Sequence, residues 1–114
     1  MKLSLVKEIL KANVLVGDDS LDDEVLFGAA GDLMSDLLKN PREGAILLTG
    51  LINLQAVRTC VIAGMSAIVF VRGKTLSPEI ISYAEEHALP ILLTPYNMFS
   101  SCGKLFKNGL KSIR

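Results

Sequence analysis

Four short polar turns contain the residues of this 114-residue chain that are best placed to contact a ligand. Each turn follows an apolar run typical of a strand; the turns are Gly31-Asp32, Thr49-Gly50, Arg72-Gly73-Lys74 and Thr94-Pro95. Glycine in such a turn lets backbone N–H groups approach a ligand, and a helix that follows directs its positive dipole end toward it. The turns therefore predict a binding edge for something small and negatively charged.

The side chains suggest how a small anion or nucleotide could be held. Arg72 and Lys74 can neutralise a phosphate or carboxylate, and Asn53 or Thr49 can set its orientation. The full candidate set is Asp32, Thr49, Gly50, Asn53, Arg72, Gly73, Lys74 and Thr94. The alternative is that these are ordinary strand-to-helix turns, which favour Gly, Asp and Thr for backbone reasons.

The segment Arg72 to Thr75 invites comparison with a phosphate-binding P-loop, because Gly-Lys-Thr follows a predicted strand. A P-loop needs another glycine five residues before the glycine of that triplet, so that the loop can wrap a phosphate. Ile68 occupies this position, inside the predicted strand. The sequence therefore argues against a P-loop.

No catalytic or metal-binding arrangement is predicted. The single histidine, His87, lies near a predicted helix C-terminus, and Cys60 and Cys102 show no Cys-x-x-Cys spacing. The acidic stretch from Asp18 to Glu24 lacks the alternating oxygen ligands, central glycine and terminal glutamate of an EF-hand. We expect a solvated acidic loop, no cofactor and no enzyme activity.

Composition limits the classes of partner. Lysine plus arginine equals aspartate plus glutamate at 12 each, which does not favour nucleic acid or an anionic membrane. The longest nearly unbroken apolar run, Cys60 to Val71, is shorter than the ~18 residues of a membrane span. Half of the residues are apolar, so exposed patches should meet a partner, and we expect a homodimer. Two isolated cysteines indicate a cytoplasmic protein with reduced thiols.

Hydrophobic periodicity and turn signals predict alternating helices and strands. Asn53 and Ser77 are expected N-caps, Asp32 is a plausible one, and Gly64 is expected just after a helix. From Lys104 to Arg114 basic residues alternate with apolar ones; this pattern could dock on an acidic partner, but it is more typical of a solvated helix end with frayed residues. Helices are predicted near residues 3–10, 33–39, 54–63, 77–87 and 97–109, and strands over 14–16, 25–29, 45–48, 67–71 and 91–94.

This alternation predicts an α/β fold. The runs 45–48 and 67–71 are apolar on both faces, as in strands covered by helices on both sides of a parallel sheet. We expect residues 1–114 to form a single three-layer α/β/α domain with a mostly parallel sheet of about four to five strands.

Several blocks together resemble a stand-alone DRTGG-domain protein over about residues 14–110. The blocks are Gly31-Asp32-Leu33-Met34-Ser35-Asp36, Leu48-Thr49-Gly50-Leu51, Val57-Arg58-Thr59, Ala67-Ile68-Val69-Phe70-Val71-Arg72-Gly73-Lys74 and Cys102-Gly103. The Asp-Arg-Thr-Gly-Gly string that names the family is absent. The resemblance implies an α/β domain similar to the N-terminal domain of HPr kinase/phosphorylase.

The resemblance also implies a role. Related domains are accessory modules in phosphotransacetylase-like proteins and lie beside CBS domains in regulatory pyrophosphatases, and stand-alone copies often accompany iron-only hydrogenase genes. We therefore expect a non-catalytic regulatory or assembly domain that self-associates, with a possible partner in a larger metabolic or hydrogenase system. The alternative is a sensor whose main role is to bind a nucleotide or phosphate.

Overall fold

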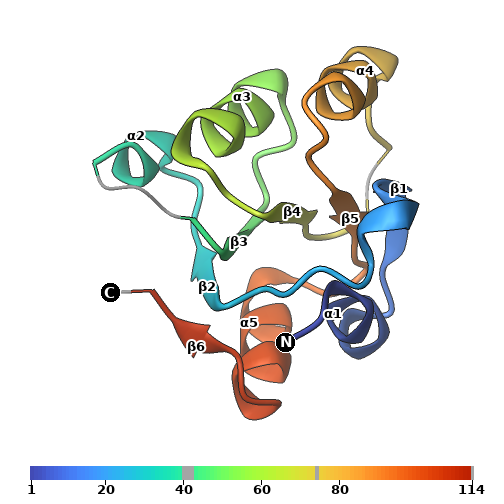
Figure 1. The fold of residues 1–114 in the computed structure, drawn as a ribbon. Coiled ribbons are helices and arrows are strands. Elements are labelled where there is room, and N and C mark those ends of the chain that lie inside the picture. The colour runs from blue at the N-terminus through green and yellow to red at the C-terminus, as the bar shows by residue number, and fades with distance from the viewer. Residues whose placement is uncertain (40–42, 74, 114) are drawn as a thin grey trace.

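The computed structural model describes residues 1–39, 43–73 and 75–113. Helices and strands alternate along most of the chain (Figure 1). The helices are α1 (Leu3–Leu10), α2 (Met34–Leu37), α3 (Leu54–Ala63), α4 (Pro78–Glu86) and α5 (Met98–Lys107), with a short 3-10 turn, η1 (Asp18–Ser20). The strands are β1 (Asn13–Val16), β2 (Phe27–Ala30), β3 (Ala45–Thr49), β4 (Ala67–Phe70), β5 (Ile91–Leu93) and β6 (Lys111–Ser112).

The described strands form one six-stranded sheet in the order β1-β5-β4-β3-β2-β6. Pairing is parallel from β5 through β4, β3 and β2 to β6, and β1 alone runs antiparallel, against β5. The predicted mostly parallel sheet is thereby confirmed, with six strands where the sequence suggested four or five. Strand β6 was not foreseen, because its two residues, Lys111 and Ser112, are polar and exposed.

Helices cover both faces of the sheet (Figure 1). On one face α2, α3 and α4 enclose a core that includes Leu47, Ile68 and Phe70. On the other face α1 and α5 enclose a second core that includes Ile46 and Val69. Every residue of β3 and β4 is buried, as expected for central strands of a parallel sheet covered on both sides. The three-layer α/β/α prediction is confirmed.

Local capping signals explain where several helices begin and end. The side chain of Asn53 accepts a hydrogen bond from the Ala56 amide at the start of α3, and Ser77 does the same for Ile80 at the start of α4. Gly64 ends α3 in the left-handed conformation, with φ of 75°. These three predictions are confirmed.

Two local predictions are wrong. The residue before α2 that takes the cap position is Leu33, which makes no side-chain cap hydrogen bond, so Asp32 does not cap this helix. The C-terminal segment is not a frayed helix end. Helix α5 stops at Lys107, Gly109 reverses the chain with φ of 103°, and Leu110 is buried in the core before β6 pairs with β2.

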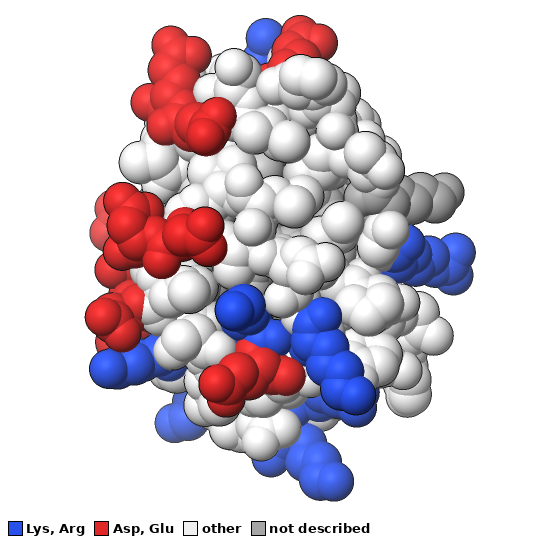
Figure 2. Space-filling view, turned by 90° about the vertical axis from the view of Figure 1, so that its right-hand side faces the viewer, with Lys and Arg blue, Asp and Glu red and all other residues white. Residues whose placement is uncertain are grey.

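Charge is mixed on the surface. Figure 2 shows one side of the molecule, where acidic groups line one margin, basic groups gather in the lower half, and an uncharged area lies between them. Within the described ranges no helix is both long and apolar enough to cross a lipid bilayer.

Candidate functional site

The candidate turns meet at one edge of the sheet. Strands β2, β3, β4 and β5 are adjacent and parallel, so their carboxyl ends point the same way. This is the edge at which open parallel α/β sheets bind ligands. The shared edge predicted from the sequence is therefore present.

Asp32 joins the ends of β2 and β3. Its Oδ1 atom accepts one hydrogen bond from the Thr49 hydroxyl at 2.8 Å and another from the Gly50 amide at 2.9 Å. The register of the two strands explains this, because Ala30 pairs with Leu48, and Asp32 therefore lies level with Gly50. Thr49 is fully buried, and its hydroxyl also accepts from the Leu51 amide at 3.1 Å. The result is a fixed carboxylate at an exposed position.

The turn after β4 has an unusual backbone. Arg72 and Gly73 both lie in the left-handed region, with φ of 69° and 49°. The Arg72 amide donates to the Tyr96 carbonyl at 3.0 Å, and the Gly73 amide donates to the Thr94 carbonyl at 2.8 Å. An arginine in this conformation carries a conformational cost of order 1 kcal/mol, and such residues cluster at functional sites.

These contacts change the expected mode of binding. The amides of Gly50 and Gly73 already donate to protein oxygens, so they do not form the backbone cradle for an anion that the sequence suggested. Among the candidate residues that the structure describes, Arg72 is therefore the group that can attract an anion with its side chain. Arg72 is exposed, and it is the basic candidate within the described residues. The other basic candidate, Lys74, lies outside them.

Asn53 and Thr94 have structural roles. The Oδ1 atom of Asn53 is occupied as the N-cap of α3. The fully buried hydroxyl of Thr94 donates to the Leu10 carbonyl at 2.6 Å, and it accepts from the Tyr96 amide at 3.3 Å. Thr94 thus fixes the end of β5 to the end of α1.

A pocket of about 330 Å³ opens at this edge. It is lined by Asp32, Gly50, Ile52, Val71, Arg72 and Met98. Three of the predicted residues, Asp32, Gly50 and Arg72, therefore share one pocket. Its apolar wall was missed: Ile52 follows the β3 turn and Met98 begins α5, and no polar or spacing signal marks either residue as a ligand contact.

The other reactive side chains are not at this pocket. The His87 ring stacks on Tyr83 with centroids 4.2 Å apart, and its Nδ1 lies 3.0 Å from the Tyr83 carbonyl oxygen. Burial raises the pKa of the Cys60 thiol to about 12, and burial also raises the pKa of Cys102. In the part of the chain that the structure describes, no group of three or more His, Cys, Asp or Glu side chains is arranged to hold a metal ion.

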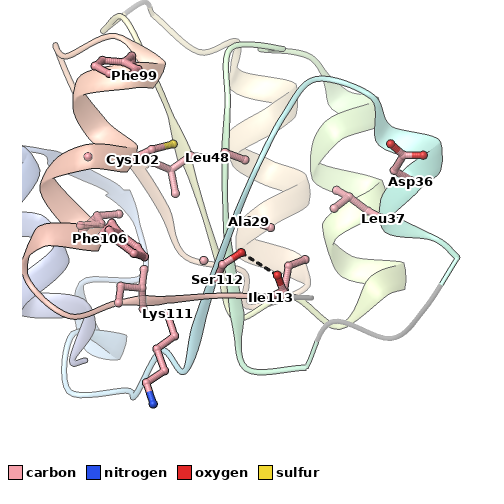
Figure 3. Close-up of a pocket in the computed structure, with 15 residues that line it drawn as sticks. Ala29, Asp36, Leu37, Leu48, Phe99, Cys102, Phe106, Lys111, Ser112 and Ile113 are labelled. Carbon is pink, nitrogen blue, oxygen red and sulfur yellow. Dashed lines mark hydrogen bonds between the residues drawn. The ribbon is translucent and has the colours of Figure 1, made fainter.

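A larger groove lies at the β6 side of the sheet (Figure 3). We call it the α5 groove; its volume is about 630 Å³. Helix α5 forms one wall with Phe99, Cys102 and Phe106, and Asp36 and Leu37 of α2 lie across from it (Figure 3). Its other lining residues are Gly28, Ala29, Ala30, Leu48, Gly103, Leu105, Leu110, Lys111, Ser112 and Ile113. No motif or spacing in the sequence predicted this groove.

Comparison with known proteins gives one family and one class of structure. The model of the DRTGG domain family matches residues 5–107. No curated protein matches the sequence. Among solved structures, the chain is similar to the CBS and DRTGG domains of the regulatory region of Clostridium perfringens pyrophosphatase, solved with its activator diadenosine tetraphosphate. Identity is 17% and the TM-score is 0.73 over 91% of this chain, which spans 45% of the length of that one.

Proposed function

Because the chain belongs to the DRTGG domain family, we propose that it is a non-catalytic regulatory domain that binds a small nucleotide-like anion in the strand-end pocket. The observation that carries this proposal is that two side chains of opposite charge, Asp32 and Arg72, line the same pocket. Asp32 offers a fixed carboxylate, and Arg72 offers a guanidinium in a strained turn.

The two groups suit a ligand that carries both hydrogen-bond donors and negative charge. Oδ1 of Asp32 is occupied by Thr49 and Gly50, whereas Oδ2 accepts no hydrogen bond from the described residues. A sugar hydroxyl can donate to Oδ2, and a phosphate can accept from Arg72. Inorganic phosphate alone would be attracted by the Arg72 guanidinium but repelled by the Asp32 carboxylate. A nucleoside phosphate uses both groups.

Pocket size limits the ligand further. A volume of about 330 Å³ is near the lower end of the range for small-molecule sites, which is roughly 300–1,000 Å³. Ile52, Val71 and Met98 supply an apolar wall for a base or another flat group. The similar pyrophosphatase region binds a nucleotide activator, diadenosine tetraphosphate, which supports this ligand class. The pocket fits one nucleoside phosphate unit better than a whole dinucleotide.

Isothermal titration calorimetry against adenosine and guanosine mono-, di- and triphosphates, diadenosine tetraphosphate and inorganic phosphate tests the proposal. We expect at least one nucleotide to bind more tightly than inorganic phosphate, and Arg72→Ala to weaken that binding by roughly tenfold or more while folding is retained. Arg58→Ala is the matched control, because Arg58 is an exposed arginine on α3 whose guanidinium lies over the Tyr83 ring at 5.6 Å. Absence of heat with every nucleotide, or equal loss in both variants, would overturn it.

We also propose that the domain self-associates, as a regulatory or assembly module would. Support comes from eight large apolar side chains that stay exposed: Leu5, Leu26, Phe27, Leu33, Leu38, Ile62, Phe99 and Phe106. Phe99 and Phe106 are the extreme aromatic cases, at 88% and 72% exposed. Clustered exposed aromatics are typical of interaction surfaces. Light scattering at micromolar concentration tests this part, and a strict monomer would refute it.

A further inference from the structure

Gly50 leaves a space beside the Asp32 carboxylate that the fold does not require. Its φ is not positive, so the backbone at this position would accept a residue with a side chain. A Cβ atom added there would lie 3.8 and 3.9 Å from the two carboxylate oxygens of Asp32 and 3.7 Å from Cγ2 of Val71, which is ordinary van der Waals contact. Neither strain nor collision therefore explains the glycine. Its effect is to keep this part of the strand-end pocket open.

We propose that this space is a ribose subsite, in which the two vicinal hydroxyls of a ribonucleoside phosphate donate to Oδ2 of Asp32 while the phosphate contacts Arg72. The inference rests on the proposed nucleotide binding, and it adds which part of the nucleotide each end of the pocket takes. It narrows the ligand class to ribonucleotides over deoxyribonucleotides. It also makes Gly50 a residue that determines specificity, because a larger side chain would keep the sugar from the carboxylate.

The hydrogen-bonding capacity of Asp32 matches a vicinal diol. An ionised carboxylate has about four lone-pair positions, two on each oxygen. Oδ1 uses both of its positions, for the Thr49 hydroxyl at 2.8 Å and the Gly50 amide at 2.9 Å. Oδ2 accepts no hydrogen bond from the described residues, so two positions are left for two donors. Ribose presents two neighbouring hydroxyl donors, whereas 2′-deoxyribose retains only one of them.

The parallel register sets the spacing of the site. Asp32, Gly50 and Val71 lie at one level, at the ends of the adjacent strands β2, β3 and β4. Neighbouring strands lie about 4.8 Å apart, so Asp32 and the end of β4 are separated by roughly 10 Å, with Gly50 between them. Arg72 follows Val71 directly. In a nucleotide the 5′-phosphate lies at the opposite end of the sugar from the 2′ and 3′ hydroxyls, so one nucleotide can reach both charged groups across Gly50.

Charge sets the direction in which the nucleotide lies. The Asp32 carboxylate accepts from hydroxyl groups and repels a phosphate, whereas the Arg72 guanidinium attracts a phosphate. A nucleotide bound in the reverse direction would place its phosphate against the carboxylate. The apolar wall formed by Ile52 and Met98, both half-buried, is left for the base.

Sugar analogues test the subsite on the unaltered protein. The adenosine and guanosine phosphates of the calorimetric panel are compared with their 2′-deoxy and 2′,3′-dideoxy forms. We expect the dideoxy form to bind at least about 30-fold more weakly than the ribo form, because each hydroxyl donates to a charged acceptor. Equal affinities would overturn the subsite and leave nucleotide binding intact. A chain that binds no nucleotide would overturn this inference together with the proposed function.

Asp32→Asn tests whether the carboxylate is the acceptor. The Thr49 hydroxyl and the Gly50 amide both donate, so they select the amide oxygen of the asparagine and turn its NH2 group toward the ligand. The ratio of ribo to dideoxy affinity should fall from at least about 30 to less than about 5. An unchanged ratio would overturn the assignment. Discrimination that disappears when EDTA removes divalent cations would also overturn it, since Asp32 would then hold a metal ion instead of a sugar.

Gly50→Ala tests the space itself. Its methyl group should fold without strain but occupy the gap beside the carboxylate, so we expect ribonucleotide affinity to fall by at least about tenfold. Gly103→Ala is the matched control, because Gly103 also has no positive φ, a Cβ there would meet nothing within 4 Å, and it lies outside the strand-end pocket. Circular dichroism checks that both variants are folded. Full affinity in Gly50→Ala, or an equal loss in Gly103→Ala, would overturn the subsite.

Discussion

The Asp32 carboxylate lies 2.8 Å from the Thr49 hydroxyl, and this hydrogen bond ties the turn after β2 to the end of β3. The same oxygen holds the Gly50 amide at 2.9 Å, so one carboxylate fixes two consecutive residues of the neighbouring turn. The carboxylate is thereby oriented before any ligand arrives. A preoriented group loses less conformational entropy on binding.

Replacing Asp32 with alanine should lower the free energy of unfolding by about 1–2 kcal/mol, because the buried Thr49 hydroxyl and the Gly50 amide lose their acceptor. Urea denaturation followed by circular dichroism measures this. Asp36→Ala is the control: its ion pair with Lys39, at 3.3 Å, joins two exposed side chains and should contribute no more than about 0.5 kcal/mol. An equal loss of stability in the two variants would show that the hydrogen bonds to Asp32 do not stabilise the fold.

The core of the fold could be read from the sequence, because its signals are local. The runs that became β3 and β4 are apolar on both faces, and this pattern requires covering layers. The caps at Asn53 and Ser77 depend only on the three residues that follow each. The location of the candidate edge followed from parallel strand order alone.

The function of single residues at that edge could not be read, because it depends on contacts distant in sequence. The role of Asp32 depends on the register between β2 and β3, and Thr94 bonds to a carbonyl 84 residues away. Strand β6 has only two residues and no apolar run; it forms because Leu110 is buried just before it. The α5 groove arises from small residues on β2 that matter only beside α5.

Because of the backbone conformation at Arg72, two substitutions at this position should differ in stability but not in nucleotide affinity. With φ of 69°, this position suits glycine, so Arg72→Gly should be more stable than Arg72→Ala by about 1 kcal/mol. Both variants lack the guanidinium and should bind nucleotide equally weakly. Thermal or urea unfolding gives the stability difference, and calorimetry gives the affinities. An Arg72→Ala protein at least as stable as Arg72→Gly would show that the turn carries no strain.

The Thr94 hydroxyl should matter for stability and not for charge recognition. Thr94→Val keeps the shape of the side chain but removes both the donor to the Leu10 carbonyl and the acceptor for the Tyr96 amide. We expect a loss of about 1–3 kcal/mol in the free energy of unfolding, since buried polar groups are left unpaired. Thr75→Val, at an exposed position, should change stability by less than about 0.5 kcal/mol. A near-neutral Thr94→Val would show that this junction between β5 and α1 is dispensable.

Cys60 predicts a specific dependence of stability on pH. Burial raises its pKa from 9.0 to about 12, so between these values the folded thiol keeps its proton while the unfolded thiol loses it. The folded state then binds more protons, and stability falls as pH rises. The contribution is fully present below pH 9 and is lost progressively between about pH 9 and 12.

Between pH 8 and pH 10 this linkage should lower the free energy of unfolding by about 1 kcal/mol, because each pH unit between the two pKa values corresponds to about 1.4 kcal/mol. Urea unfolding of wild type and Cys60→Ala, both under a reducing agent, measures it. All other ionisable groups are common to both proteins, so the difference between the two curves isolates Cys60. We expect the Cys60→Ala protein to start less stable, because its core has lost a sulfur atom, and to lose less stability over this range. Parallel curves would show that Cys60 ionises equally well in the folded and unfolded chain.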